Sequence, residues 1–194
     1  MTKAEVRKAV LRARRAVSSE QRRTEAEALR GQLPALVHAG ETVCAYVPVG
    51  SEPGSLAMLD ALLGLGARVL LPVAHEDEAG VPQPLQWGEY RPGRLVDARF
   101  GLREPGPPLL GVDAIASASV VLVPALSVDV AGVRLGRGAG FYDRSLARAD
   151  PGARLIAVVR DDELVERLPA DDHDVPMTHA LTPGRGLVRL GERD

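Results

Sequence analysis

Hydrophobic residues near the start of the chain recur at helical spacing. A run separated by four, three and four positions predicts the buried face of an opening helix: Val6, Val10, Ala13 and Val17. Ser18 followed by Gln21 predicts a capping box at the start of a second helix. The buried stripe of this second helix is expected to consist of Ala26, Leu29 and Leu33. Gly31 and Pro34 are expected to end it.

The pattern then changes to short apolar runs. Four of these runs are typical of buried strands: 43–47, 69–71, 120–123 and 155–159. Helical patterns accompany them over three segments: 56–65, 142–149 and 162–168. Strands that alternate with helices of about ten residues indicate a parallel sheet with right-handed crossovers. We therefore predict an α/β fold with an open, mainly parallel sheet flanked by helices, a Rossmann-like arrangement in three αβα layers.

Residues 74–111 interrupt this alternation and are rich in proline. A structureless loop of this length is improbable inside a compact domain. We predict a hairpin or small subsheet around 85–90, which would form a small extra β-lobe against the main sheet. The chain shows no internal repeat and no linker, so we predict a single domain over residues 1–194.

The composition is ordinary for a soluble globular protein. Hydrophobic residues make up 45% and charged residues 26% of the 194 positions. The net charge of −2 gives no overall attraction to nucleic acid or to an acidic membrane. No apolar run approaches the roughly 20 residues of a membrane span, and the charged N-terminus lacks the apolar core of a secretory signal. We expect a cytoplasmic protein; a transit peptide is the weaker alternative, because the Arg-rich N-terminus also contains several glutamates.

Cysteine and histidine usage excludes several kinds of site. The single cysteine, Cys44, excludes an intramolecular disulfide and a cysteine-cluster metal site. It lies in an apolar run, so we interpret it as a small buried hydrophobe. The four histidines show no zinc-ligand spacing: His38, His75, His173 and His179. No Ser-His-Asp or Cys-His arrangement is placed for acyl transfer.

The most specific chemistry lies in the stretch 133–144, which reads VRLGRGAGFYDR. Gly136, Gly138 and Gly140 alternate with larger residues, which allows positive φ and a backbone that turns its N–H groups toward a ligand. Successive inward N–H groups form a concavity suited to anions. A helix that starts near Gly140 would add partial positive charge at the same point.

Charged residues in this stretch extend the anion-binding interpretation. Arg134 and Arg137 would neutralise a phosphate chain, and Asp143 is placed to hold a divalent cation on it. The glycine spacing matches neither the P-loop nor the dinucleotide motif. A glycine-rich turn without a ligand is therefore the alternative.

Glu52 is predicted to lie near this glycine loop. It stands in the segment 48–54, which follows the first predicted strand, and the glycine loop follows the third. The carboxyl ends of parallel strands meet at one edge of a sheet, where ligands bind. A solvated loop carboxylate is the alternative interpretation of Glu52.

The segment LVPALSVD at 122–129, followed by Gly132 and by RLGRGAGFYDR at 134–144, closely resembles the signature of 5-formyltetrahydrofolate cyclo-ligases, also called methenyltetrahydrofolate synthetases. The resemblance implies an enzyme that uses ATP and Mg²⁺ to convert 5-formyltetrahydrofolate into 5,10-methenyltetrahydrofolate, with release of ADP and phosphate. It extends over nearly the whole chain and is weak over residues 74–98. The implied ligands are ATP and a folate with or without a polyglutamate tail, and we expect a monomer that binds neither nucleic acid nor membrane.

The resemblance also implies roles for individual residues. The implied ATP-binding residues are Lys3, Arg7, Arg134, Leu135, Gly136, Arg137, Gly138, Ala139, Gly140, Phe141 and Tyr142. Lys3 and Arg7 match a family Lys-xxx-Arg pair that grips the ATP phosphates; without the resemblance they would indicate a solvated basic stripe. We interpret Lys3, Arg134 and Arg137 as the candidate catalytic residues, which act by neutralising phosphate charge.

The folate and the metal are assigned in the same way. Glu52 and Tyr142 are the implied folate contacts, since a carboxylate can accept hydrogen bonds from the N–C–NH₂ edge of a pterin. Asp143 and Asp174 are the implied Mg²⁺ ligands. Asp174 follows His173, as in a His-Asp segment of the family, and a plain acidic loop is the alternative.

Other family features receive no catalytic role. The segment 100–105, FGLREP, resembles a family element, and a Glu-Pro turn is often only a turn. Trp87 is interpreted as a packing residue of the lobe, with stacking on a pterin as the alternative. Val128 stands where the family usually has phenylalanine. Ala139 replaces the usual glycine or lysine, which such a loop tolerates if this residue keeps a negative φ.

Two other function classes stay open at this stage. One is a non-catalytic folate- or nucleotide-binding relative, which the intact glycine stretch and the Lys3–Arg7 pair disfavour. The other is a different enzyme on a similar sheet, such as a sugar-phosphate isomerase, which would need neither nucleotide nor magnesium.

Overall fold

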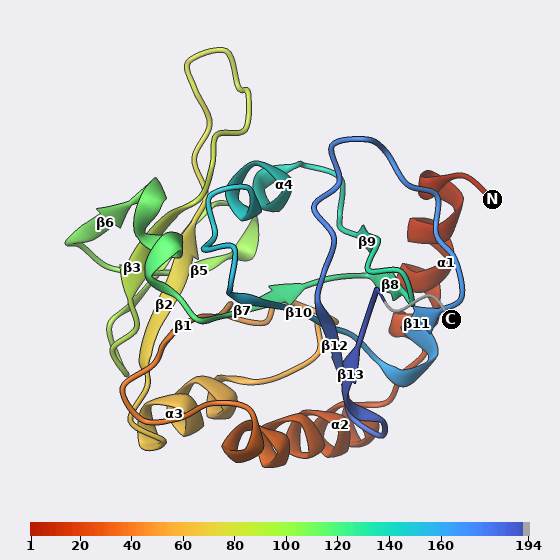
Figure 1. The fold of residues 1–194 in the computed structure, drawn as a ribbon, viewed down its shortest axis with the longest axis horizontal. Helices are drawn as coiled ribbons and strands as arrows, with labels where there is room; N and C mark the ends of the chain where they lie inside the picture. The colour runs from red at the N-terminus through yellow and green to blue at the C-terminus, as the bar shows by residue number, and fades with distance from the viewer. Residues whose placement is uncertain (192–194) are drawn as a thin grey trace.

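Eight strands form the central sheet of the computed structural model, which describes residues 1–191 (Figure 1). Five parallel strands occupy the middle of the sheet, in the order β12 (His179–Thr182), β10 (Arg154–Val158), β7 (Val120–Pro124), β1 (Thr42–Cys44) and β2 (Arg68–Val73). Antiparallel strands extend both edges: β13 (Gly186–Arg189) beside β12, and β3 (Gln86–Glu89) followed by β6 (Leu109–Gly111) beyond β2. The predicted open, mainly parallel sheet is confirmed.

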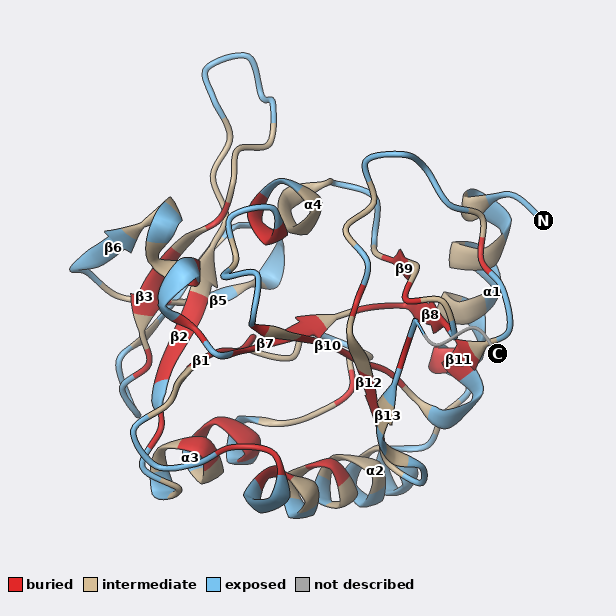
Figure 2. Cartoon of the chain, in the orientation of Figure 1, coloured by how far each residue is buried: buried red, intermediate tan, exposed pale blue. Residues whose placement is uncertain are grey.

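Helices cover both faces of this sheet. α2 (Ser19–Gln32) and α3 (Leu56–Gly64) lie side by side on one face, and α4 (Phe141–Leu146) lies on the other (Figure 1). The hydrophobic side chains form two cores accordingly, one containing Leu29 and Leu62 and the other containing Leu146. Burial follows the strands and the inner faces of the helices (Figure 2). The predicted three-layer αβα arrangement is confirmed.

The two N-terminal helices match their predicted positions, but the buried face of the first differs from the prediction. α1 spans Lys3–Arg15, and its buried residue is Arg14, whereas the predicted Ala13 is exposed. Gln21 N–H donates to Ser18 Oγ over 3.1 Å, so Ser18 caps α2. α2 passes through Gly31 and ends at Gln32, before the 3₁₀ helix η1 (Leu33–Ala35) that contains Pro34.

A second, three-stranded sheet was not predicted. It consists of β11 (Leu164–Val165), β8 (Ser127–Asp129) and β9 (Arg134–Leu135). The predicted helix over 162–168 is wrong: a single 3₁₀ turn, η4 (Asp161–Glu163), leads directly into β11. Extended backbone here pairs with β8 and buries Leu164, and these tertiary contacts override the local helical pattern.

The region 74–111 also differs from the prediction. The segment predicted to form a separate hairpin supplies β3, which joins the main sheet by pairing with β2. The hairpin of the lobe is instead β4 (Leu95–Asp97) with β5 (Arg103–Pro105), joined through the 3₁₀ turn η2 (Arg99–Gly101). η3 (Val112–Ser117) then leads to β7. Trp87 on β3 is fully buried in a hydrophobic core, which confirms the packing interpretation.

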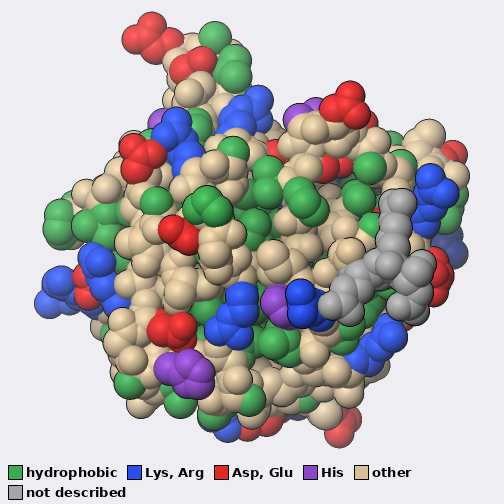
Figure 3. All heavy atoms as spheres, viewed as in Figure 1, with side chains coloured by type: hydrophobic (Ala, Val, Ile, Leu, Met, Phe, Trp, Pro, Cys, Tyr) green, Lys and Arg blue, Asp and Glu red, His purple; other side chains and the backbone are tan. Residues whose placement is uncertain are grey.

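The core cysteine, the helices and the surface charges show three further properties. Cys44 is fully buried on β1, and burial raises the pKa of its thiol to about 12, as expected for a packed hydrophobe. None of the helices in the described part of the chain combines the length and apolar character needed to cross a bilayer. On the face shown in Figure 3, basic and acidic side chains are interspersed.

Candidate active site

The glycine loop 136–140 connects β9 to α4. Gly138 has φ of 107° and Gly140 has φ of 81°, values that favour glycine. Within residues 1–191 the only non-glycine residue with positive φ is Phe100, so Ala139 meets the condition under which alanine is tolerated. Gly140 is the N-cap of α4, which begins at Phe141, as predicted. Alternation of φ across this loop suits an anion-binding backbone concavity.

Arg134 lies beneath the loop in a largely buried position. Its Nη2 donates to Asp143 Oδ1 over 2.7 Å, and its guanidinium lies 5.8 Å from the centre of the Tyr142 ring. A Cβ at Gly136 would lie 2.6 Å from Arg134 Nη1, so this position has no room for a side chain. The buried Arg134 Nε and Tyr142 Oη have no hydrogen-bond partner within the described residues. Both donors are buried beside the loop.

Glu52 reaches the glycine loop from the other side. Its Oε1 lies 3.3 Å from Arg137 Nε, which confirms the proximity predicted from the parallel topology. Its Oε2 accepts from Val49 N–H over 2.9 Å, and Tyr46 Oη donates to Pro53 O over 2.6 Å. The segment 48–54 that carries Glu52 is therefore held at two points. Burial, with a smaller effect from the Glu52 charge, raises the pKa of Tyr142. The Tyr142 hydroxyl therefore stays protonated and can donate.

The basic face of α1 lies over the same loop. Arg7 Nε donates to Gly136 O over 2.9 Å. Lys3 Nζ donates to Asp171 Oδ2 over 2.7 Å and to Asp174 Oδ2 over 2.8 Å. Burial lowers the pKa of Lys3, but its bonds to the two aspartates outweigh this and the net shift is upward. Burial raises the pKa of Asp174, but the bonds from Lys3 and from the Asp171 N–H, together with the nearby positive charge, outweigh it, so the net shift is downward.

The predicted residues thus gather around the loop in separate ion pairs. Asp143 pairs with Arg134, whereas Asp174 pairs with Lys3. The two predicted metal ligands therefore occupy different ion pairs. Asp174 also belongs to a group with Asp171 and His173 whose ligand atoms lie within 4.8 Å of one another.

Sequence reasoning missed a buried ion pair next to this site. Arg14 Nε and Nη2 donate to the two carboxylate oxygens of Glu163 over 2.7 and 2.8 Å. Arg14 shares a helix face with Lys3 and Arg7, at intervals of four and seven residues, and this spacing was the available signal. The hydrophobic spacing predicts a buried face that contains Val10 and Ala13 but not Arg14.

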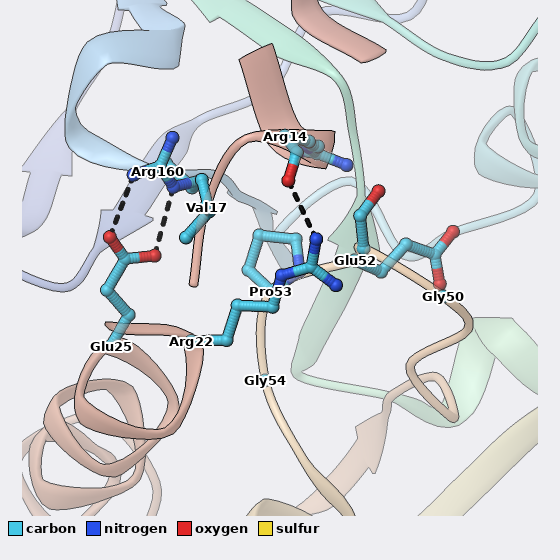
Figure 4. Close-up of a pocket in the computed structure, with 10 residues that line it drawn as sticks. Arg14, Val17, Arg22, Glu25, Gly50, Glu52, Pro53, Gly54 and Arg160 are labelled. Carbon is cyan, nitrogen blue, oxygen red and sulfur yellow. Dashed lines mark hydrogen bonds and ion pairs between the residues drawn. The ribbon is translucent and has the colours of Figure 1, made fainter. Parts of the chain in front are cut away.

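A pocket of about 110 Å³ opens beside Glu52, between the α1–α2 junction and the loop after β1 (Figure 4). Its lining residues are Arg14, Val17, Arg22, Glu25, Gly50, Ser51, Glu52, Pro53, Gly54 and Arg160. The pocket borders the Glu52 loop and the Arg14 end of α1; none of the glycine-loop residues, Lys3 or Arg7 lines it.

Known proteins resemble this chain over nearly its whole length. The sequence model of the 5-formyltetrahydrofolate cyclo-ligase family matches residues 1–183. A Mycolicibacterium smegmatis protein named 5-formyltetrahydrofolate cyclo-ligase is 64% identical over 189 residues, which cover 97% of each chain. An Escherichia coli protein of the same name is 30% identical over 177 residues, covering 89% of this chain and 95% of that one.

A solved structure agrees with these sequence relationships. Aquifex aeolicus 5,10-methenyltetrahydrofolate synthetase superposes with a TM-score of 0.80 at 26% sequence identity. The match covers 100% of this chain and 95% of the Aquifex chain. The likeness therefore extends over the whole fold.

Proposed function

The chain belongs to the 5-formyltetrahydrofolate cyclo-ligase family, and we propose that the residues around its glycine loop carry out the family's reaction. That reaction converts 5-formyltetrahydrofolate and ATP into 5,10-methenyltetrahydrofolate, ADP and phosphate. The family match over residues 1–183 supports the activity. Three basic side chains at the glycine loop, with Lys3 one helical turn from Arg7 on α1, support the site: Arg7, Arg134 and Arg137.

The chemistry requires the formyl oxygen to become a leaving group. Direct ring closure would expel hydroxide, which leaves poorly from carbon. We propose that the formyl oxygen attacks the γ-phosphorus of ATP, so that ADP departs and an imidoyl phosphate forms on N5. N10 then attacks the formyl carbon, the C–O bond breaks, and phosphate leaves with the electron pair. Loss of the N10 proton leaves the methenyl bridge between N5 and N10.

The protein contributes charge neutralisation and positioning to these steps, as phosphoryl transfer generally demands. Arg134 is buried and rigidly placed, so it is suited to the charge that develops on the transferred phosphoryl group. Arg7 contacts the loop at Gly136 O, and Lys3, one helical turn earlier on α1, contacts Asp171 and Asp174. Both would exchange their present partners for phosphate oxygens. The N–H groups of the loop would complete the cradle.

Asp143 and Asp174 fit a magnesium ion by the chemistry of their donor atoms. Both offer hard carboxylate oxygens beside basic residues that are suited to phosphate, and Mg²⁺ is commonly held by one or two carboxylates together with substrate phosphates. When bound, Mg²⁺ would supply charge neutralisation on the phosphate chain. Arg134 and Lys3 hold these carboxylates in place by direct ion pairs.

The folate would lie against Glu52 and Tyr142. The Glu52 carboxylate is held by Val49 N–H and Arg137, so it is oriented to accept from a pterin N–C–NH₂ edge. The unpartnered Tyr142 hydroxyl is a donor available to the same ligand. We propose that Glu52 fixes the pterin while the glycine loop presents the γ-phosphate to the formyl oxygen.

The observation that carries this proposal is the convergence of Glu52 and the basic residues on one loop. The test is the growth of methenyltetrahydrofolate absorbance when purified protein is mixed with 5-formyltetrahydrofolate, Mg²⁺ and ATP. We expect growth only when all the components are present, with one phosphate released per product. Binding of ATP and folate without product would indicate a non-catalytic relative, and binding of neither would contradict the proposal.

A further inference from the structure

α1 is attached to the rest of the molecule chiefly through basic side chains. Neither hydrophobic core of the described residues includes a residue of α1, and Arg14 is the buried residue of this helix. Its principal polar contacts lie on one face, through Lys3, Arg7 and Arg14. Val6, Val10 and Leu11 are only partly buried. The position of α1 therefore depends on polar contacts more than on apolar packing.

Arg14 makes the most buried of these contacts. The exposed fractions of Arg14 and Glu163 are 1% and 4%, whereas the Lys3 side chain is 19% exposed. Besides its two bonds to Glu163, Arg14 Nη2 donates to Ala125 O over 2.6 Å. An arginine fork held by a carboxylate and a carbonyl fixes orientation as well as distance. This contact is therefore the most rigid attachment of α1.

Glu163 is itself fixed from the opposite side. Its Oε2 accepts from Arg160 N–H over 2.8 Å, and its backbone oxygen accepts from Ser127 Oγ over 2.6 Å. Glu163 lies in η4 and Ser127 in β8, so the ion pair joins α1 to the small second sheet. Glu163 is thus held by bonds that do not involve Arg14.

The end of α1 is also tied to α2. Arg22 Nη2 donates to Arg14 O over 2.7 Å, and Arg160 forms a bidentate pair with Glu25 at 2.9 and 3.0 Å (Figure 4). The pocket beside Glu52 lies among these residues. The junction between α1 and α2 is thus held by arginine contacts around a hollow rather than by a filled core.

We propose that the Arg14–Glu163 pair positions α1 so that Lys3 and Arg7 reach the ATP phosphates. This inference rests on the proposed function, and Arg14 acts in it as a positioning residue that does not touch ATP. Arg14 lies eleven residues beyond Lys3, which corresponds to about 16 Å along the helix axis. A small rotation at Arg14 is therefore enlarged at Lys3, and the phosphate-binding end loses its register.

The test compares Arg14→Met with Arg15→Met in the full chain. Methionine keeps much of the arginine volume without the fork, and Arg15 is an exposed arginine on the same helix. For Arg14→Met we expect the KM for ATP to rise about tenfold, because a misplaced α1 lowers the fraction of molecules competent to bind ATP. We expect the KM for the folate and kcat to change by less than about threefold. Arg15→Met should match the wild type.

Amide hydrogen exchange separates positioning from general instability. In Arg14→Met the amides of α1 should exchange faster, while those of β7 and β10 keep wild-type protection, because only the helix is released. Uniformly faster exchange across the main sheet, or an unchanged KM for ATP, would overturn the inference. Hydrogen exchange needs no turnover, so it shows whether Arg14 positions α1 even if the proposed function is wrong.

A double variant keeps the inference testable if Arg14→Met folds poorly. Removing both partners in Arg14→Met/Glu163→Leu leaves no stranded buried charge and should restore thermal stability. We expect this stable protein to retain the raised KM for ATP. A stable double variant with wild-type KM for ATP would show that the pair contributes packing alone. A wild type without methenyltetrahydrofolate formation would contradict the proposed function, whatever the exchange data show.

Discussion

Charged residues around the glycine loop neutralise one another in this structure. Arg134 pairs with Asp143, Arg137 with Glu52, and Lys3 with Asp174. In the proposed reaction, Arg134 and Lys3 would exchange their aspartates for phosphate oxygens when ATP binds, which leaves the aspartates to the metal, while Arg137 keeps Glu52 oriented. The ion pairs therefore hold the side chains near their working positions without leaving buried charges unpaired.

Arg134 should be the most sensitive of these residues. We expect Arg134→Met to lower kcat by about 100-fold or more, because it removes a preorganised charge from the phosphoryl group. Arg148→Met is the matched control, since Arg148 lies just beyond α4 and forms an exposed ion pair with Asp113 on η3. Steady-state kinetics with circular dichroism as a folding check would decide. Wild-type kcat in folded Arg134→Met would contradict the assignment.

The Lys3–Asp174 pair should appear in the pH dependence of stability. The pKa of Asp174 is lowered, so its contribution is present above the unfolded value of 3.8 and is lost as pH falls through the folded value. The pKa of Lys3 is raised above 10.5, so its contribution is present below 10.5 and is lost only at still higher pH. Asp174→Asn should therefore reduce the loss of thermal stability between pH 5 and pH 2.

The comparison is made by thermal unfolding of both proteins across that pH range. At neutral pH the variant should melt below the wild type, and the two melting temperatures should converge in acid. Parallel curves with a constant offset would show that Asp174 does not titrate with a lowered pKa.

At the scale of elements, the sequence predicted most of the main sheet and its helices. The runs at 43–47, 69–71, 120–123 and 155–159 each overlap a parallel strand, because buried parallel strands read as continuous apolar segments. The helix start near Gly140 could also be predicted locally, because glycine residues adopt the positive φ that this turn requires.

The errors occur where long-range contacts override the local pattern. The helical pattern over 162–168 yields to pairing of β11 with β8, and 85–90 joins β2 instead of forming its own hairpin. β8 lies far from β11 in the sequence, whereas β3 pairs with the strand just before it; in both cases local periodicity does not show which strand is the partner. Arg14 was missed because its carboxylate partner is 149 residues away.

The glycine loop should tolerate little change of shape. Gly136→Ala places a Cβ within 2.6 Å of Arg134 Nη1, so the guanidinium must move. We expect kcat to fall by about tenfold to 100-fold, because small displacements of a positioning group are costly. Gly31→Ala is the matched control: its Cβ meets nothing within 4 Å on α2, and it should leave kcat unchanged. Equal kcat in the two variants would contradict this account of the loop.

At the scale of the whole molecule, the single domain that the sequence predicts would unfold in one cooperative transition. Trp87 is a suitable probe because it is the only tryptophan and is fully buried on β3, toward the end of the sheet that carries the lobe. Tryptophan fluorescence and far-ultraviolet circular dichroism should give coincident urea curves. An earlier fluorescence transition would show that the lobe side unfolds separately.

The order of strands also explains why residues distant in sequence form one site. β1 and β7 are parallel neighbours, so the loop that carries Glu52 and the segment that leads to the glycine loop leave the sheet at the same edge. α1 then closes this edge through Arg7 and Lys3. The Val128 substitution is buried within the small sheet, and nothing in the structure explains it in terms of substrate choice.

The central claim is that the formyl oxygen is transferred to phosphate during ring closure. The most direct test uses 5-formyltetrahydrofolate labelled with ¹⁸O in the formyl group, together with Mg²⁺ and unlabelled ATP, and measures the mass of the released phosphate. We expect one ¹⁸O atom in each phosphate released with methenyltetrahydrofolate. Phosphate without the label would contradict phosphorylation of the formyl oxygen, and absence of methenyltetrahydrofolate would contradict the activity itself.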